Sequence, residues 1–451
     1  MEKNWTTGSV GKSILQFSLP YLLSYFLQTL YGMADLFIIG QYEGVASTTA
    51  VSVGSQVMHM LTVMIVGVAM GTTVTVGRAI GANHPKEAAR CIGNTVTLFM
   101  AGSVVLAAVL LGLVRPIVGL ISTPAEAVEG TVAYLTICFI GIPCITAYNV
   151  IASIFRGMGD SKSPMYFIAA ACVTNVALDY LFMGVLRFGP AGAALGTTLS
   201  QLVSVVISLM VILRRPTGIR LTKADFKPDK AMLGRMLGIG IPVMLQDGFI
   251  QVSFITITII ANQRGLTDAA AVGIVEKIIS FLFLVPSSML STVSALGAQN
   301  IGAGKPERVE LILRWAIGIG FGFGAVVAAG MQFFAPWVVA PFTSNAAVVA
   351  AGAQYIRGYI FDCMFAGIQF SFSGYFCAYG KSGLSFLHNI LSILLVRLPG
   401  AYFGSKFFPQ TLLPMGLASA CGSLFSSVVC LICWLWLRRR LHSDETAVRS
   451  S

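Results

Sequence analysis

An aspartate lies in the middle of a long apolar stretch of this sequence, in the segment NVALDY at residues 175–180. Asn175 precedes Asp179 by four residues, so the two side chains share one face if the segment is helical. A second aspartate, Asp35, interrupts another apolar run, and Thr197 lies in a third. Carboxylate, amide and hydroxyl oxygens bind small hard cations, and a desolvated carboxylate can hold a proton instead. These four residues predict a cation-binding site for Na⁺, for H⁺, or for both in competition.

The elements that must position these residues are membrane spans. The chain has 451 residues, of which 56% are hydrophobic and only 10% are charged, whereas a soluble globular protein has about 25% charged residues. The apolar runs reach the roughly 20 residues that a helix needs to cross a bilayer, and they lack the alternating polarity of barrel strands. They predict an all-α integral membrane protein with twelve spans, near 14–41, 48–77, 91–114, 128–155, 165–187, 190–213, 236–262, 269–298, 311–335, 346–379, 383–405 and 412–437.

Basic residues are distributed unevenly over the segments that connect these spans. One alternate set of segments holds 22 lysines and arginines and the other holds four. This bias predicts that both termini are cytoplasmic, in the inner membrane of a bacterial cell. It also explains the net charge of +11 without a nucleic-acid partner. The first apolar run is long and contains Pro20 and Gln28, so we expect no cleavable signal peptide.

An internal repeat relates the two halves of the chain. GANHPKEAAR at Gly81 returns as GAGKPERVEL at Gly302, and GMGDSKS around Gly159 returns as AYGKSGL around Gly380, both 221 residues later. Six spans per half predict a parallel repeat, with a substrate cleft between two bundles that rock to alternate access. The predicted ranges are an amino-terminal six-helix bundle at 1–213, a basic cytoplasmic linker at 214–235, a carboxy-terminal six-helix bundle at 236–437 and a short cytoplasmic tail at 438–451.

Depth in the membrane links the polar residues of the first half. A helix rises about 1.5 Å per residue, which places Asp35 and Thr197 roughly 10 Å, and Asp179 about 13 Å, from the outer ends of their spans. Ionisable residues at such depths are costly and point to function. The alternative is that each polar group pairs with a neighbouring helix and only fixes the packing.

The second half carries intramembrane residues of both charges. Opposite charges favour internal pairing, so we expect a structural charge network made of Glu276, Lys277, Arg357 and Arg397. Other polar residues are candidates for a substrate cleft, namely Gln28, Tyr31, Gln246, Asp247, Gln251 and Asp362.

Motifs for catalysis are missing from the sequence. There is no GxxxxGK[ST] phosphate loop, and the four histidines do not have the spacing of metal ligands. An intramembrane enzyme would need paired catalytic groups, and a channel would show selectivity-filter repeats. We therefore expect neither enzymatic activity nor a cofactor, apart from Na⁺ or H⁺ as a coupling ion.

The chain resembles the multidrug and toxic compound extrusion (MATE) family. The resemblance lies in MADLFIIG, GRAIGA, RGMGDSKSP and NVALDY in the first half, and in GIPVMLQ, GAQNIGAGKPERV and RLPGAYF in the second. It implies a V-shaped pair of six-helix bundles that acts as a secondary antiporter and exports amphiphilic, often cationic, compounds in exchange for Na⁺ or H⁺. We expect a monomer whose partners are small molecules and the lipid bilayer.

One branch of the family, the DinF type, is similar in its cation site. The resemblance implies that Asp35, Asn175, Asp179 and Thr197 form this site here. The NorM-type branch adds carboxylates on spans 7 and 10, where this chain has Ile250 and Ala366; a second, carboxy-terminal cation site is therefore in doubt. A flippase for lipid II or lipid-linked oligosaccharides, of related architecture, is the alternative function.

Overall fold

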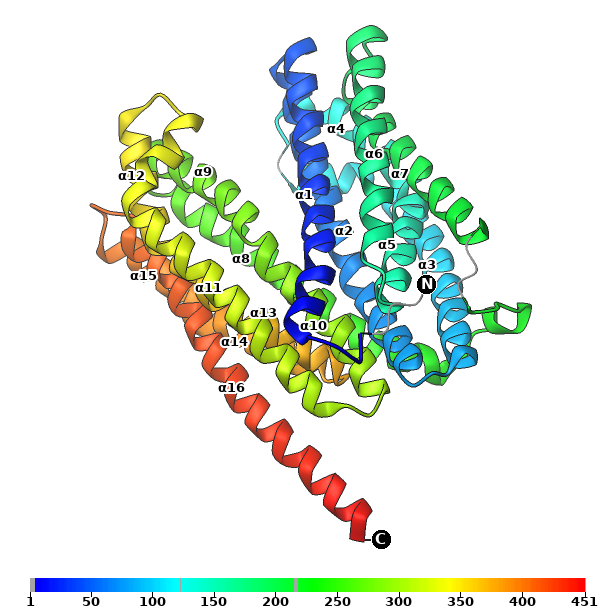
Figure 1. The fold of residues 1–451 in the computed structure, drawn as a ribbon. Helices are drawn as coiled ribbons and strands as arrows, with labels where there is room; N and C mark the ends of the chain where they lie inside the picture. Colours follow the sequence, from blue (N-terminus) through cyan, green and yellow to red (C-terminus); the bar gives the residue numbers. More distant parts are fainter. Residues whose placement is uncertain (1–4, 122, 215–217, 451) are drawn as a thin grey trace. The chain divides into compact units, whose positions relative to one another are not determined.

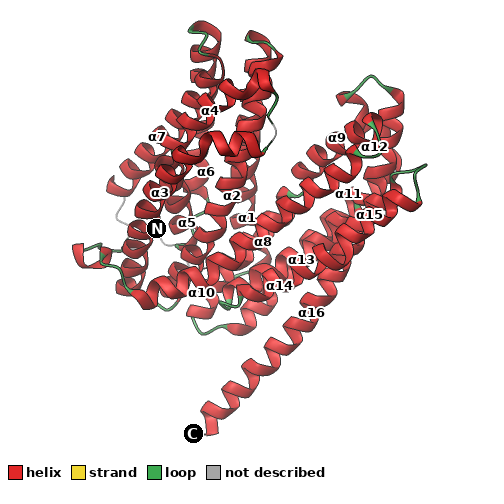
Figure 2. Cartoon of the chain, turned by 180° about the vertical axis from the view of Figure 1, so that it is seen from behind, coloured by secondary structure: helices red, strands yellow, loops and turns green. Residues whose placement is uncertain are grey.

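The computed structural model of the chain describes residues 5–121, 123–214 and 218–450, with side chains up to Leu441. Residues 1–4, 215–217 and 451, which belong to the predicted first bundle, linker and tail, lie outside the described residues, as does residue 122. Nearly all described residues are helical and none of them forms a strand (Figures 1 and 2). The prediction of an all-α fold is thus confirmed.

In the first half of the chain the long helices are α1 (Val10–Tyr42), α2 (Val45–Gly81), α3 (Pro85–Leu120), α4 (Val128–Ile140), α5 (Ile142–Gly157), α6 (Lys162–Asp179) and α7 (Gly189–Arg214). Shorter elements are η1 (Ala125–Ala127), the π-helical η2 (Tyr180–Val185) and η3 (Lys223–Phe226). The second half contains α8 (Lys230–Asn262), α9 (Leu266–Leu282), α10 (Leu284–Gly302), α11 (Pro306–Val339), η4 (Ala340–Phe342), α12 (Ala346–Tyr359), α13 (Phe361–Ala378), α14 (Ser382–Ser392), the π-helical η5 (Ile393–Arg397), α15 (Leu398–Phe407) and α16 (Leu413–Ser450).

The count of membrane spans differs from the prediction of twelve. Among the described residues ten helical segments are long and apolar enough to cross a bilayer, or eleven if α4 and α5, which are bent by 50° at Gly141, form one broken span. The remaining predicted span, 346–379, corresponds to α12 and α13. α12 has only 14 residues, fewer than the roughly 20 that a span requires, and α13 carries Asp362, Gln369 and two serines.

Prolines account for several breaks in the helices. A proline lacks the N–H that would bond to the carbonyl four residues earlier. Pro143 is the second residue of α5, just after the bend at Gly141. Pro286 removes the bond to Leu282, where α9 ends, and Pro399 stands at the start of α15. The break at Ile360, between α12 and α13, has no such cause in the sequence.

The chain divides into two compact units. Unit 1 consists mainly of Leu15–Met244 with Ala298–Gly304, and unit 2 mainly of Leu245–Gly297 and Lys305–Ser451. The division falls inside α8, so the described part of the linker belongs to unit 1. In unit 1, α6 packs along α7 and α2 along α5; in unit 2, α13 packs against α11 and α16. Each unit has apolar core clusters of its own.

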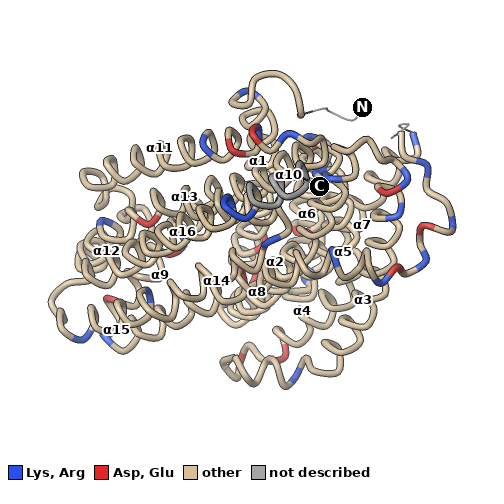
Figure 3. Tube along the Cα trace, turned by 90° about the horizontal axis from the view of Figure 1, so that it is seen from below, with Lys and Arg blue, Asp and Glu red and all other residues tan. Residues whose placement is uncertain are grey.

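Charged residues are sparse along the helices, and most of the chain carries none (Figure 3). Polar side chains are nevertheless buried in both units. Because burying a polar group without a partner costs free energy, these positions deserve a closer description than the apolar core that surrounds them.

Candidate coupling-ion site

The start of α6 is fixed by the polar turn before it. Gly159 has a φ of +87°, a conformation that glycine adopts without steric cost. The next residue, Asp160, accepts hydrogen bonds from the backbone N–H groups of Lys162 and Ser163, each at 3.0 Å. Such bonds satisfy the free donors at a helix N-terminus. The motif RGMGDSKSP therefore sets where α6 begins, and with it the height of Asn175 and Asp179.

Asp35 and Thr197 are joined across two helices of unit 1. The Thr197 hydroxyl, on α7, donates a hydrogen bond of 3.0 Å to Asp35 Oδ2, on α1. The Asp35 side chain is buried, and its other oxygen, Oδ1, has no hydrogen-bond partner among the described residues. The structure thus brings together two residues that are 162 positions apart in the sequence.

Asn175 and Asp179 face the same place from α6. Both are fully buried and lie within interaction distance of Asp35. Neither oxygen of Asp179 nor either polar atom of the Asn175 amide has a hydrogen-bond partner in the described part of the chain. All four residues predicted for the cation site therefore meet in unit 1.

Gly196 makes room for this arrangement and was not singled out by the sequence analysis. A Cβ atom at this position of α7 would collide with Asp179 Oδ1 and would lie 3.6 Å from Asn175 Nδ2. Any side chain at residue 196 would therefore displace the carboxylate. A glycine directly before a candidate ligand, here Thr197, is a signal that the sequence contained.

A second polar pair lies one helical turn from the first. Tyr31, which was predicted for the substrate cleft, precedes Asp35 by four residues and interacts with the side chain of Gln201, four residues after Thr197. Gln201 is buried, and its Oε1 has no partner among the described residues. Each of the three helices thus contributes two polar residues at i and i+4, a spacing that keeps them on one face.

The electrostatics of this cluster are one-sided. Neither Asp35 nor Asp179 takes part in an ion pair within the described residues. A buried carboxylate without a counter-ion costs several kcal/mol or more, so a bound cation or a proton would stabilise the cluster. The two carboxylates, the amide oxygen and the hydroxyl are oxygen ligands of the kind that hard cations take.

A multi-acid or histidine–cysteine metal site is not indicated. No group of three or more His, Cys, Asp and Glu side chains converges in the described part of the chain. The nine cysteines are free, including Cys430 and Cys433, which are spaced as CxxC on α16. The donor set of unit 1 fits a monovalent cation or a proton better than a transition metal, which prefers nitrogen and sulfur ligands.

The helix changes its geometry directly after Asp179. Residues Tyr180–Val185 form a π-helical segment, a rare conformation that is frequent at functional sites. The wider π turn redirects the side chains that follow Asp179, so this carboxylate stands at a point where the backbone of α6 is irregular.

The charged residues of unit 2 behave differently. Asp362, on α13, is fully buried and forms an ion pair with Arg397, at the end of η5. Arg397 also donates a hydrogen bond of 2.9 Å to the hydroxyl of Tyr359 and lies 5.6 Å from the centre of the Phe254 ring. The acid of unit 2 is therefore neutralised by a base that the protein itself supplies.

The predicted charge network is only partly assembled. The Thr258 hydroxyl donates to Glu276 Oε2 at 3.0 Å, and Glu276 is close enough to Arg397 to interact with its charge. Lys277 is exposed and takes part in no ion pair among the described residues. Neighbouring residues of a helix point about 100° apart, which explains why Lys277 turns away while Glu276 faces inward. Arg357 forms no ion pair within the same residues, and its Nε has no hydrogen-bond partner.

The residues predicted for a substrate cleft are divided between the units. Gln28 and Tyr31 are half-buried in unit 1. The others belong to unit 2: Gln246 and Asp362 are buried there, whereas Asp247 and Gln251 are half-buried. Among these, Asp362 is engaged by Arg397, so it serves as a structural ion-pair partner in this structure.

One buried network in unit 2 was missed because its members are far apart in the sequence. His388 lies between two serines, with Ser373 Oγ 2.8 Å from Nε2 and Ser426 Oγ 2.7 Å from Nδ1. The three residues come from α13, α14 and α16 and are all essentially inaccessible to solvent. We interpret this network as a packing contact that joins three helices.

Comparison with known proteins places these features in context. The sequence pattern of the family described as MatE matches residues 20–181 and 242–403, which is well over half of the chain. The two matched segments begin at Pro20 and Pro242, the prolines that the internal repeat also relates.

Among curated proteins, the chain is 29% identical to "Probable multidrug resistance protein YpnP" of Bacillus subtilis (strain 168), over 98% of this chain and 99% of that protein. It is 25% identical to "FAD transporter" of Shewanella oneidensis, over 91% of this chain and 93% of the relative. It is 24% identical to "Multidrug export protein MepA" of Staphylococcus aureus, over 97% and 96%.

Solved structures share the fold. "Crystal structure of MATE in complex with MaL6" superposes with a TM-score of 0.89 and covers 98% of both chains at 23% sequence identity. At this level of identity the likeness concerns the fold alone. It agrees with the expectation of a multi-pass helical membrane protein.

Proposed function

This chain belongs to the MatE family of multidrug and toxic compound extrusion proteins, and from that premise we propose that it exports amphiphilic organic compounds in exchange for Na⁺ or H⁺. Members of this family are transporters, so the expectation that the chain is not an enzyme is confirmed. The proposal adds a substrate class, an antiport reaction and a site for the coupling ion.

The substrate class is supported by the names of the relatives. Two of the three relatives described above are named for multidrug resistance or export, and the third for transport of FAD. Drugs and FAD both combine flat aromatic rings with polar groups, so an amphiphilic organic substrate is the class that these names share. None of the three is named as a flippase, and the lipid-precursor alternative is therefore not favoured.

The observation that carries the coupling part of the proposal is the pair of buried carboxylates in unit 1. Asp35 and Asp179 adjoin each other without a basic partner, and three of their four oxygens have no hydrogen bond among the described residues. Such a cluster is stable when it holds a cation or a proton and unstable when it is empty. This difference can supply free energy that links ion movement to a change of conformation.

In the proposed cycle, rocking of the two six-helix bundles exposes the ion site and the substrate site alternately to the two sides of the membrane. Ion entry from outside neutralises Asp35 and Asp179 and favours the conformation that releases the substrate. We further propose a monomer in the bacterial inner membrane with both termini in the cytoplasm, in keeping with the bias of basic residues, and without a nucleic-acid partner or a resident cofactor.

The test uses purified protein in liposomes loaded with a panel of fluorescent amphiphilic dyes. We expect efflux of at least one dye under a Na⁺ gradient or a pH gradient, and a loss to below a tenth of the wild-type rate in Asp35→Asn and in Asp179→Asn. The amide cannot carry the negative charge that attracts the ion.

Glu129→Gln is the matched control, because Glu129 is an exposed carboxylate paired with Arg115 on the surface. It should leave efflux unchanged, since surface pairs contribute little. Wild-type efflux with either gradient in both aspartate variants would refute the assignment of the coupling site, while absence of any dye efflux in the wild type would refute the substrate class.

A further inference from the structure

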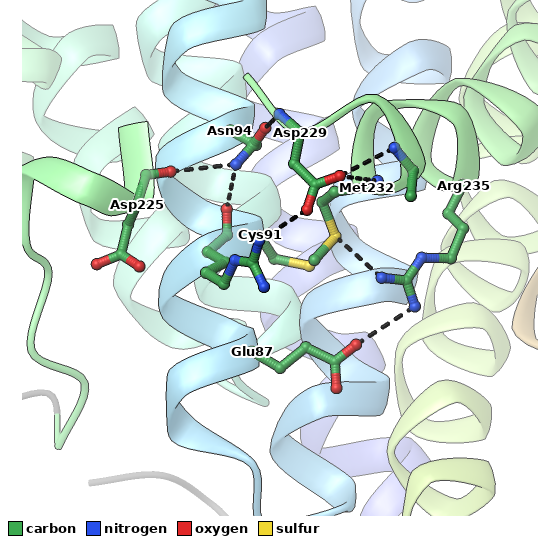
Figure 4. A network of polar contacts seen from close by, with 9 residues as sticks. Glu87, Cys91, Asn94, Asp225, Asp229, Met232 and Arg235 are labelled. Atoms are coloured by element: carbon green, nitrogen blue, oxygen red, sulfur yellow. Dashed lines mark hydrogen bonds and ion pairs between the residues drawn. The ribbon is translucent and has the colours of Figure 1, made fainter. Parts of the chain in front are cut away.

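The linker before α8 is held against α3 by a dense polar network (Figure 4). The Asn94 amide, on α3, donates to the carbonyl oxygen of Asp225 at 3.1 Å and accepts from the backbone N–H of Asp229 at 2.7 Å. Arg90, one turn earlier on α3, forms an ion pair of 2.9 Å with Asp229. The linker thus lies at a fixed place beside α3 within unit 1.

The first turn of α8 is fixed in the same network. Asp229 Oδ1 accepts from the backbone N–H groups of Ala231 at 2.9 Å and Met232 at 3.3 Å, which caps the helix. Arg235 then reaches Glu87 on α3 at 3.3 Å. The acids Asp225 and Asp229 are therefore both occupied, Asp225 by the backbone and hydroxyl of Thr222.

A groove of about 550 Å³ lies where this linker meets α3. Its wall on α3 is one helix face, which includes Leu98, Gly102, Val105 and Val109 at spacings of three or four residues. Pro228 and Leu233 close it on the linker side, and Asn94 and Thr97 stand at its polar end. The rest of the lining is apolar and contains no charged residue.

The dimensions of the groove suit a lipid chain. From Asn94 to Val109 the helix rises roughly 22 Å, whereas the hydrocarbon of one bilayer leaflet is about 15 Å thick, half of the whole core. Gly102 has open space where its Cβ would be, and Val105 and Val109 are exposed. One extended acyl chain can therefore lie along this face of α3 over the full depth of a leaflet.

Unpaired positive charge stands at the linker end of the groove. Lys227 directly precedes the lining residue Pro228, and Lys230 follows it by two residues. Both lysines are exposed, and neither takes part in an ion pair within the described residues. Because the nearby acids are already bound, the two ammonium groups are free to bind an external anion.

We propose that this groove binds one anionic phospholipid, with an acyl chain along α3 and the phosphate headgroup on Lys227 and Lys230. A chain-length apolar groove that ends at two free lysines matches the two parts of such a lipid, and basic clusters at the membrane surface attract anionic headgroups. The site is separate from the cluster at Asp35 and does not depend on the proposed transport function.

The test is native mass spectrometry of the purified full-length protein in detergent, titrated with dioleoylphosphatidylglycerol and, separately, with dioleoylphosphatidylcholine. We expect one saturable phosphatidylglycerol adduct that binds at least tenfold more tightly than phosphatidylcholine. Each lysine near the headgroup contributes roughly fivefold, so Lys227→Gln/Lys230→Gln should weaken phosphatidylglycerol binding about 25-fold. Gly102→Leu should weaken binding of this lipid by filling the groove.

Two controls separate a site from a general effect of charge or size. Lys162→Gln/Lys381→Gln removes the same charge from two exposed lysines in other loops, and Gly112→Leu adds the same side chain at an α3 glycine with open space outside the groove. Both controls should bind phosphatidylglycerol as the wild type does. Equal affinity of the wild type for the two lipids, or unchanged affinity in the Lys227/Lys230 variant, would overturn the proposal.

Discussion

The buried charges of units 1 and 2 stand at related positions but are neutralised in different ways. The two matches to the family pattern run from 20 to 181 and from 242 to 403, and the same offset relates Asn175 to Arg397 and Asp35 to Ile257. In unit 1 two acids share a site with an amide and a hydroxyl. In unit 2 the related position holds a guanidinium, which pairs with Asp362 from another helix.

A π-helical segment adjoins the buried charge in both units. It follows Asp179 in unit 1 and ends at Arg397 in unit 2. The irregular backbone is therefore common to both units, and the difference between them lies in the side chains. An acid with a built-in base needs no external ion, whereas acids without a base do. This contrast is the physical reason for placing ion coupling in unit 1.

The largest effect is expected when unit 1 is given the side chain of unit 2. In Asn175→Arg the guanidinium lies next to Asp35 and Asp179 and supplies a permanent counter-ion. Gradient-driven dye efflux from liposomes should fall to the rate without a gradient. Asn175→Gln keeps an amide at this position and should retain part of the activity. Gradient-driven efflux at the wild-type rate in correctly folded Asn175→Arg would break the contrast between the units.

The next effect concerns stability in unit 2. Asp362→Asn leaves Arg397 buried without its ion-pair partner, which should lower the free energy of unfolding by about 3–5 kcal/mol. Asp362→Leu/Arg397→Met removes both charges and should recover most of this loss, because apolar side chains of similar size often replace a buried ion pair at no cost. Thermal unfolding in detergent measures both variants. A double variant as unstable as the single one would show that the pair has a role beyond mutual neutralisation.

The smallest effect is expected from the hydroxyl of Thr197. Thr197→Val keeps the shape of the side chain and removes the hydrogen bond to Asp35. Such a bond to a charged group contributes about 1.5 kcal/mol, so the ion concentration for half-maximal efflux should rise roughly tenfold. Thr197→Ser preserves the hydroxyl and should behave nearly as the wild type. An unchanged ion dependence in Thr197→Val would exclude this oxygen from the site.

Much of this architecture can be predicted from local properties of the sequence. Long apolar runs indicate membrane helices, and helix rise alone places Asp35 and Thr197 at the same depth, where the structure joins them. The i, i+4 spacing that drew attention to Asn175 and Asp179 also holds for Tyr31 with Asp35 and for Thr197 with Gln201. Applied to every span, the same rule would have found Gln201.

Other features depend on contacts between distant segments. Arg397 pairs with Asp362 and not with Glu276 or Asp247, and nothing local in the sequence selects this partner. The broken spans at Gly141 and Phe283 could be predicted from Pro143 and Pro286. The break at Ile360 could not, because no proline or glycine lies beside it. The count of twelve uninterrupted spans failed for this reason.

Direct ion binding to the purified protein tests the central claim, that the unpaired acids of unit 1 hold the coupling ion. Binding of radioactive Na⁺ is measured in detergent, together with proton release or uptake when a transported dye is added. The wild type should bind Na⁺ or exchange protons, and Asp35→Asn/Asp179→Asn should do neither while it remains folded. Wild-type Na⁺ binding or proton exchange in that double variant would contradict the account.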